Sequence, residues 1–377
     1  MDLYGEKKNA IRTVVFLCAI MLVLSIADLL PQEYVSLGKE RKTEAFVPKP
    51  VKADVQNGTF MEEYEDYVLE DFVSRENWKA FRTHIDVLRG VREINGVYLG
   101  KHDYLIEKHS KEEFAPETIN KRLEYMQILV KAFPGTKLMP VPTADNILTE
   151  QLPAFAPFYD QRTLLAQMKT VLGEERVIDI YDILKTHAEE EIYYRTDREW
   201  TSLGAYYGYL AFAKSYHLPA FQYLKQEPEK VTEDFRGGLH EKVGIASKAE
   251  EILMFSATLD KKYTITYDGE KTTNSFYEPA YLEGEDKLGY FLDGRHGVTV
   301  IERESFSKRK LFVIKDGFGS NMIPLLARHY KTIYVVDLSC YNGNLIDFMK
   351  ECDTNGDMDV LVLYDCVTFV ESFQFGY

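Results

Sequence analysis

The chain contains few cysteines, and their arrangement does not fit two common kinds of site. Of the four cysteines in 377 residues, Cys18 lies in an apolar run near the N-terminus. The other three, Cys340, Cys352 and Cys366, are an odd number and cannot form a complete disulfide framework. One bridge among them and three buried thiols both fit the sequence. Their irregular spacing without histidine partners does not match a zinc site. We therefore predict no metal and no cofactor.

Basic residues are also scarce, since 45 Lys and Arg stand against 60 Asp and Glu and give a formal net charge of −15. Nucleic acids and other anionic polymers bind to clustered Lys and Arg. The sequence therefore argues against a nucleic-acid partner, and we interpret its acidity as a property that favours solubility. With 45% hydrophobic residues, the chain is long enough to bury one large core or two medium ones.

One long apolar run lies near the N-terminus, at residues 11–30, after Lys7 and Lys8. A positive flank followed by about 20 apolar residues is typical of a signal peptide or an uncleaved signal anchor. Residues 25–27 have the small side chains of a cleavage site, but the run is long for a cleaved signal. We expect residues 1–30 to form a cytoplasmic tip and an anchor of a single-pass cell-membrane protein, with the main domain extracytoplasmic.

The rest of the chain divides into three regions. Residues 31–58 are polar and charged and include three prolines, which is typical of a stalk. In residues 59–90, apolar and aromatic residues recur at helical spacing and predict membrane-proximal helices. Residues 91–377 alternate short apolar runs with amphipathic patterns, except for an irregular insertion at about 228–310. Such alternation predicts βαβ units, and therefore a three-layer α/β domain with a parallel sheet.

Individual elements of this domain are predicted from periodicity and turn residues. Thr201 is expected to cap the helix that follows it. The predicted strands are 96–100, 137–142, 177–183, 264–267, 298–301, 311–315, 332–338 and 360–364, and the predicted helices are 118–133, 161–172, 201–217, 320–330 and 343–349.

The segment 193–201 reads Tyr-Tyr-Arg-Thr-Asp-Arg-Glu-Trp-Thr and directly precedes a predicted helix. It carries two carboxylates, Asp197 and Glu199, two positions apart. The alternative to a site is a charged turn that caps the helix. We take its neighbours Tyr194, Arg195 and Trp200 as candidate pocket residues.

The segment 315–321 reads Lys-Asp-Gly-Phe-Gly-Ser-Asn, between a predicted strand and a predicted helix. A hydrolase-like α/β sheet presents its nucleophile at such a turn, where backbone N–H groups can stabilise an oxyanion. Gly317 has no hydroxyl group, and its simplest role is to permit a tight turn. Ser320 is a candidate replacement nucleophile, although the sequence shows no base partner for it. Asp316 and Asn321 are candidate pocket residues.

A third candidate is the loop Gly294-Arg295-His296-Gly297, which follows an aromatic run. Glycines allow a loop to approach a ligand closely, and His296 offers a proton donor. Arg295 is a candidate pocket residue. A lone loop histidine is more often an ordinary surface residue. The remaining histidines form no spacing that predicts a metal site.

Taken together, the landmarks of the chain resemble the DHHW protein family over residues 10–370. The matching segments are 93–100, 141–145, 192–201, 234–238 and 315–318. The family is named for an Asp-His-His-Trp stretch, which reads Asp-Arg-Glu-Trp here. The resemblance implies an extracytoplasmic SGNH-hydrolase-like α/β domain, related to those of alginate O-acetyltransferases. It also implies a Ser–His–Asp triad and acyl-ester chemistry on cell-surface glycans.

Carried over to this chain, the resemblance places Asp197 at the triad aspartate, Glu199 at the triad histidine and Gly317 at the serine nucleophile. A glutamate with an ordinary pKa of about 4.3 is a much weaker base than histidine at neutral pH, although burial beside Asp197 would raise that pKa. Triad residues act as a unit, so losing two of the three predicts an inactive or repurposed site.

We therefore expect a membrane-anchored, catalytically degenerate protein that binds cell-surface polysaccharide or acts as a scaffold in a cell-envelope assembly. One alternative is an active O-acyltransferase or esterase that uses Ser320 or another nucleophile. A further alternative is a binding module in which Asp197, Glu199 and Asp316 hold a cation, for which calcium would suit the oxygen ligands.

Overall fold

The computed structural model describes residues 12–16, 18–19, 57–61, 75–223, 227–244, 247–255, 263–304 and 307–376. The chain forms two units, Met1–Asp86 and Val87–Tyr377. The predicted anchor and stalk lie outside the described residues, apart from 12–16, 18–19 and 57–58. Within the described ranges, no helix is both long and apolar enough to cross a membrane. Helix α4, Arg75–Leu88, falls in the region predicted to be helical.

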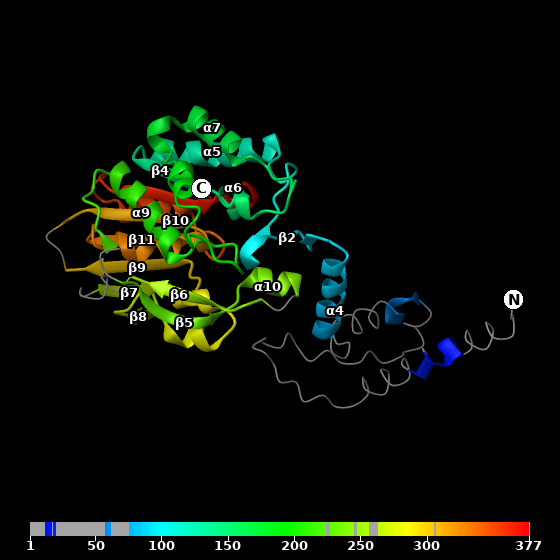
Figure 1. Ribbon diagram of the computed structural model, residues 1–377. Coiled ribbons are helices and arrows are strands. Elements are labelled where there is room, and N and C mark those ends of the chain that lie inside the picture. The colour runs from blue at the N-terminus through cyan, green and yellow to red at the C-terminus, as the bar shows by residue number, and fades with distance from the viewer. Residues whose placement is uncertain are drawn as a thin grey trace. The chain divides into compact units, whose positions relative to one another are not determined.

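The second unit is built on a seven-stranded sheet (Figure 1). Four neighbouring strands are parallel, in agreement with the predicted βαβ pattern. In sheet order these strands are β4 (Thr136–Val141), β12 (Asp359–Asp365), β10 (Lys310–Lys315) and β11 (Thr332–Asp337).

The prediction of a parallel sheet is wrong for the other three strands, which are antiparallel and make the sheet mixed. They are β9 (Val298–Arg303), β7 (Tyr263–Tyr267) and β8 (Lys271–Thr273), all from the region that the sequence marked as an irregular insertion. Strands β7 and β8 are joined by a tight turn in which Asp268 and Gly269 both have positive φ, at 49° and 76°. Such turns join antiparallel strands, whereas parallel neighbours need a long crossover.

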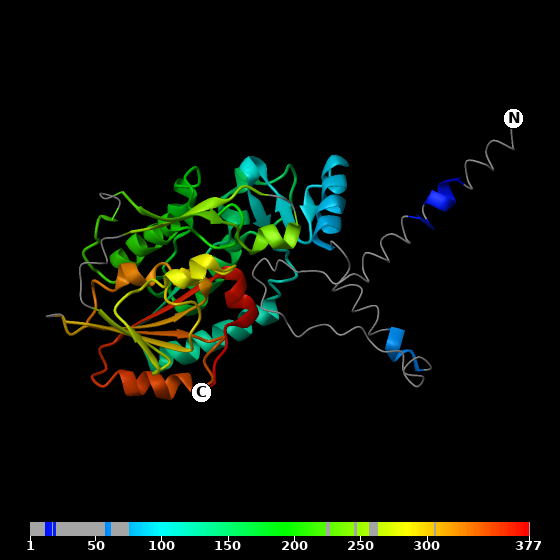
Figure 2. The same cartoon turned by 90° about the horizontal axis from the view of Figure 1, so that it is seen from below.

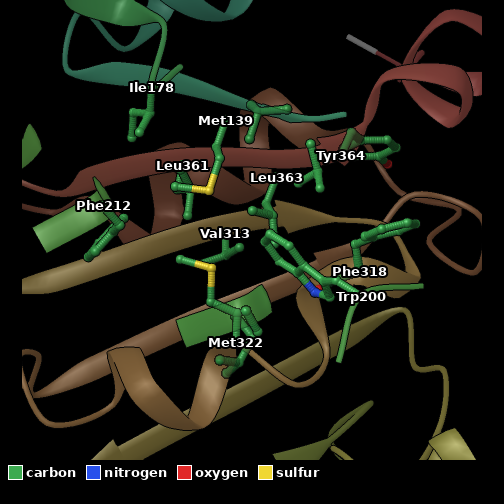
Figure 3. Close-up of a cluster of buried hydrophobic side chains, with 14 of the residues drawn as sticks. Met139, Ile178, Trp200, Phe212, Val313, Phe318, Met322, Leu361, Leu363 and Tyr364 are labelled. Atoms are coloured by element: carbon green, nitrogen blue, oxygen red, sulfur yellow. The ribbon is translucent and has the colours of Figure 1, made fainter. Parts of the chain in front are cut away.

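Helices cover both faces of the sheet, and Figure 2 shows α9 (Ser202–Ser215, green) and α12 (Leu345–Cys352, orange-red) on opposite sides. Side chains alternate between the faces of a strand. Phe312 of β10 therefore points to the α12 side, where its ring lies 5.8 Å from that of Phe348. Val313 points to the other side, toward the buried cluster in Figure 3. Buried side chains on both faces give the predicted three layers.

Helix α9 forms the centre of the second face. Its cap residue is Thr201, as predicted, and the Thr201 side chain accepts a hydrogen bond from the N–H of Gly204. The preceding residue, Trp200, is fully buried, and Figure 3 shows its indole beside Phe318 and Leu363. The helix is mostly buried, so its side chains are apolar or aromatic nearly all round.

Other helices also match their predictions. The bounds are Pro116–Ala132 for α5 and Gln161–Leu172 for α7, and the C-terminal helix α13, Cys366–Ser372, was not predicted. The remaining elements are short: β1 Glu93–Ile94, β2 Val97–Leu99, β3 Leu105–Glu107, α6 Ala144–Ile147, α8 Tyr181–Thr186, β5 Glu229–Phe235, α10 Gly238–Val243, β6 Glu250–Met254, α11 Ile323–Leu326, and single 3-10 turns at Lys101–Asp103, Thr149–Gln151, Glu174–Arg176, Pro279–Glu283, Lys287–Tyr290 and Gly317–Gly319.

Two element predictions are wrong. The segment 177–183 is not a strand, because only Val177 bridges to β4 before α8 begins at Tyr181. The predicted helix at 320–330 shrinks to α11, four residues long. Pro324 lies in its first turn, where a residue without an N–H is tolerated, so the helix begins just before it. The cysteines are all free; Cys352 and Cys366 are buried and Cys340 is exposed.

Gly208 of α9 provides a test of the packing around Trp200. A Cβ at this position would lie 2.8 Å from Cη2 of the indole, which is fully buried and cannot move aside. Replacing glycine by alanine inside a helix normally stabilises it. We expect Gly208→Ala instead to lower the free energy of unfolding by about 1–3 kcal/mol, because the core becomes overpacked. Chemical denaturation measures this.

The control is Gly135→Ala, since a Cβ at Gly135 meets no atom within 4 Å. This variant should unfold at nearly the wild-type denaturant concentration. Equal stability of both variants would show that the indole does not pack against α9 in this way.

Candidate active site

The loop that carries Asp197 and Glu199 is held in place by Glu250 of β6. The carboxylate of Glu250 accepts hydrogen bonds from the N–H groups of Arg195 and Thr196, each at 2.8 Å, and from the Thr196 hydroxyl group. The same hydroxyl oxygen accepts the N–H of Gly237 at 2.9 Å. Because three donors of this loop bind one partly buried carboxylate, the backbone of the loop is held in a fixed position.

Asp197 is bound by backbone on both of its oxygens. Oδ1 accepts the N–H of Glu199 at 3.0 Å, and Oδ2 accepts the N–H of Gly238 at 2.9 Å. A side chain at Gly237 would overlap Asp197, so only glycine leaves room for this contact. In a catalytic triad the aspartate orients an imidazole N–H. Here its bonds go to backbone N–H groups.

Glu199 and Gly317 meet directly, although 118 positions separate them in the sequence. A Cβ built on Gly317 would overlap Oε1 of Glu199. The Glu199 carboxyl group therefore occupies the space in which a nucleophile's side chain would begin. The structure thus brings together Asp197, Glu199 and Gly317, the three positions that the family resemblance assigns to the triad.

The electrostatic environment makes Glu199 an unusual carboxyl group. Burial, and then the negative charge of Asp197, raise its pKa to about 7, against the opposing effects of Arg198 and Lys315. A carboxyl group with this pKa is part-protonated at neutral pH and can act in general acid–base chemistry. What it lacks is a hydroxyl group at position 317 to act upon.

A second pair of carboxyl groups lies behind the turn. Asp316 caps the turn that begins at Gly317, with Oδ1 accepting the N–H of Phe318 at 3.0 Å, while Oδ2 accepts the N–H of Asp365 at 2.7 Å. Burial, and then the charge of Asp365, raise the pKa of Asp316 well above its usual range. The guanidinium of Arg198 lies 4.0 Å from Asp365 Oδ2 and donates to the Thr368 hydroxyl at 3.3 Å. Arg198 thus compensates part of this buried negative charge.

Ser320 has a partner that the sequence did not reveal. The side chain of Lys315, only 4% exposed, donates from Nζ to Ser320 Oγ at 2.9 Å. Burial lowers the pKa of Lys315, and the nearby charges of Asp337, Asp316 and Glu199 oppose this effect.

Other candidate residues serve mainly to hold the two motifs together. The indole N–H of Trp200 donates to the carbonyl oxygen of Phe318 at 2.7 Å and to Asn321 Oδ1 at 2.9 Å. The amide of Asn321 donates back to the carbonyl oxygen of Trp200 at 3.2 Å. Tyr194 is buried with its ring against Phe235.

The remaining candidates, Arg195, His296 and Arg295, have their partners outside the three positions assigned to the triad. Arg195 pairs with Glu191 and lies over the ring of Tyr104. His296 lies between Asp268, at 2.9 Å, and Asp293, at 3.1 Å, with its ring stacked at 4.5 Å on Tyr267. Arg295 binds Asp337, 3.2 Å away, and Ser339.

Two cavities flank the site. The smaller, of about 10 Å³, touches Asp197 and Arg198 and has room for little more than one water molecule. The larger, of about 530 Å³, has the size of a ligand site. It lies where β10, β11 and β12 end, and is lined by Tyr125, Arg295, Asp316, Asp337, Leu338, Ser339, Tyr341, Tyr364, Thr368, Ser372, Gln374, Phe375 and Gly376.

The polar residues Lys315, Asp337, Ser339 and Asp365 were not selected from the sequence. Each lies at or just after the carboxyl end of a predicted parallel strand, the edge at which open α/β sheets bind ligands. That rule would have found them. In the described part of the chain, no group of three or more His, Cys, Asp and Glu side chains is arranged to hold a metal ion.

Comparison with known proteins identifies the family to which the chain belongs. A sequence model of the family described as DHHW protein matches residues 138–336. A solved DHHW family protein from Eubacterium siraeum is 21% identical, with a TM-score of 0.61, and the match covers 74% of this chain and 93% of that one. PatB1 from Bacillus cereus, solved with a sulfonyl adduct, is 18% identical, with a TM-score of 0.60, over 74% of this chain and 98% of that one. These two structures show a shared fold. No match was found among curated proteins.

The raised pKa of Glu199 predicts a pH-dependent stability. Its folded pKa of about 7 exceeds the ordinary value of 4.5, so the folded state binds more protons than the unfolded state between these values. Stability from this group is therefore greatest below the ordinary pKa and is lost as the pH rises toward 7. Relative to Glu199→Gln, the wild type should lose about 2 kcal/mol between pH 4.5 and 8, allowing for partial exposure.

Denaturant unfolding at these two pH values gives the free energy of unfolding of each protein. The contributions of the other carboxyl groups cancel in the difference between the wild type and Glu199→Gln. Parallel curves for the two proteins would mean that Glu199 titrates normally and is not held against Gly317.

Proposed function

The chain belongs to the DHHW protein family, and we propose from this premise that it is a membrane-anchored, extracytoplasmic protein that binds cell-surface polysaccharide without a working family triad. The observation that carries the proposal is the overlap between Glu199 Oε1 and the space of a side chain at Gly317. The residue at the base position fills the site of the nucleophile, so the two replacements fit each other. The three assigned positions lie together, but they carry neither a hydroxyl group nor an imidazole.

The larger cavity supports a binding role. Sugars are commonly held by aromatic rings together with a few polar groups that fix their orientation. Tyr125, Tyr341 and Phe375 offer the rings, while Arg295 and Gln374 offer polar groups around about 530 Å³. The smaller cavity beside Asp197, of about 10 Å³, cannot admit a sugar ring as it stands. Binding is therefore proposed beside the former triad and not on it.

The proposed location follows from the sequence, since residues 11–30 form an apolar run after Lys7 and Lys8. Polysaccharide at the cell surface is within reach of a domain held outside the membrane by a stalk at 31–58. Cell-envelope assembly is the setting that this arrangement favours.

The calcium alternative has less support. Asp197 and Asp316 each accept two backbone N–H groups, so their oxygens already have donors. A calcium site needs six or more oxygen ligands directed at one point.

A matched pair of arginines tests polysaccharide binding. Arg295 pairs with Asp337 at the carboxyl ends of the strands and lines the larger cavity. Arg309 pairs with Asp359 at 2.8 Å, at the start of β10 and β12. We expect Arg295→Met to weaken binding of cell-surface polysaccharide about tenfold, a loss of about 1.4 kcal/mol, because a charged hydrogen-bond donor is removed. Titration calorimetry with purified polysaccharide measures this.

Arg309→Met is the control and should bind like the wild type. Equal loss in both variants would point to surface charge, and absence of binding by the wild type would refute the proposed function.

The triad itself can be tested by restoring it. Gly317→Ser together with Glu199→His supplies a hydroxyl, an imidazole and the existing Asp197. We expect the double variant to hydrolyse 4-nitrophenyl acetate faster than the wild type and either single variant, because triad members act as a unit. Gly317→Ser alone would also displace the Glu199 carboxyl group. A correctly folded double variant without added activity would show that the three positions do not form a triad.

A further inference from the structure

Ser320 and Lys315 are held together by the shape of the turn after β10. Gly319 makes this possible, because a Cβ there would lie 2.7 Å from both Cβ and Cδ of Lys315. The aliphatic part of the lysine therefore runs across Gly319, and its Nζ reaches Ser320 Oγ at 2.9 Å. The contact is partly buried, and the serine keeps some exposure to solvent.

The side chains around Lys315 bury its amine among apolar groups. Met139, Leu363 and Lys315 are register partners on the face of the sheet that α9 covers. In this row across three adjacent strands, the side chain of Lys315 lies next to two apolar side chains and is itself only 4% exposed. In the parts of the chain that the structure describes, no carboxylate forms a salt bridge with Lys315. Burying an ammonium group without such a partner is costly, and burial lowers the pKa of Lys315 against the opposing charges of Asp337, Asp316 and Glu199.

We infer that Ser320 and Lys315 form a serine–lysine nucleophile pair, separate from the triad positions, that accepts the acyl group of a small carboxylic ester. Serine–lysine pairs are a known alternative to the Ser–His–Asp triad. The inference goes beyond the proposed function, which concerns polysaccharide binding and the triad positions only.

The reaction balances with these two side chains and an ester. The neutral amine of Lys315 takes the proton of the Ser320 hydroxyl as Oγ attacks the ester carbonyl carbon. The tetrahedral intermediate then breaks its bond to the alcohol oxygen, which leaves with the proton returned by Lys315. The acyl group remains on Ser320 Oγ until a water molecule or a second hydroxyl group accepts it, again with Lys315 as the base.

Ser339 is a natural control within the same chain. It is exposed, and it is also hydrogen-bonded to a cation, since Arg295 donates to its Oγ. A guanidinium group does not lose its proton in proteins and cannot serve as the base. Ser339 in turn donates to Asp337 Oδ1 at 2.5 Å. Burial acts to raise the pKa of that carboxyl group, but nearby positive charge and the hydrogen bonds from Ser339 and Arg295 hold the pKa below its ordinary value, so it is a weak base. Ser339 should therefore stay unreactive.

The test uses the full-length chain and a sulfonyl fluoride, phenylmethanesulfonyl fluoride. Attack by Oγ on sulfur expels fluoride and leaves a sulfonyl group on the serine. We expect mass spectrometry to place the label on Ser320 and none on Ser339, and to find no label in Ser320→Ala. General-base assistance contributes about 10²–10⁴-fold, so Lys315→Arg, which keeps the charge but not the base, should slow labelling at least 10²-fold.

The pH profile separates a base from a structural residue. Labelling of the wild type should rise as the Lys315 amine loses its proton, in a field set by Asp316, Asp337, Glu199 and Arg295. Lys315→Met serves as a second variant of similar length if arginine disturbs folding, and both are checked by thermal unfolding. Label on another residue, no label at any pH, or labelling that survives Lys315→Arg and Lys315→Met would overturn the inference.

Polysaccharide binding is measured on the same samples. Binding without labelling of Ser320 would overturn the nucleophile pair and leave the proposed function standing. Labelling of Ser320 without polysaccharide binding would support the nucleophile pair and refute the proposed function.

Discussion

The indole of Trp200 joins the two motifs on which the site depends. Its N–H donates to the carbonyl oxygen of Phe318 and to Asn321, and Asn321 donates back to the backbone of Trp200. These three hydrogen bonds are buried, so breaking any of them would leave polar groups without partners. Because Trp200 follows Glu199 and Phe318 follows Gly317, the same link holds Glu199 against Gly317.

That link gives the site its unusual charges. Glu199 is held between Asp197 and the turn, where burial and then the charge of Asp197 raise its pKa to about 7. On the other side of the same turn, Asp316 is buried next to Asp365, and Lys315 is buried beside Ser320. Three ionisable groups with shifted pKa values thus lie at one turn. Shifted groups cluster at functional sites, which makes this turn the centre of any chemistry that the chain retains.

Local patterns predicted those elements in which local and tertiary preferences agree. The helix at 161–172 and the Thr201 cap were predicted correctly because periodicity and capping are set within a few residues. The segment 177–183 has strand-like residues, yet its backbone leaves the sheet after one bridge and forms α8. Apolar runs of this length suit a strand or a short helix equally, and packing decides between them. The antiparallel orientation of β7, β8 and β9 likewise depends on the chain connections between these strands, which the sequence patterns did not predict.

The sequence by itself determined the family resemblance, the parallel core and the absence of histidine and serine at the two triad positions, since residue identity and periodicity suffice for these. Only the tertiary structure decided that Glu199 fills the space beside Gly317 and that Lys315 reaches Ser320. The first contact joins residues 118 positions apart. The second depends on a lysine folding back across Gly319 in a buried turn. Distance and burial are properties of the packed chain, and they determine which of these groups can exchange a proton.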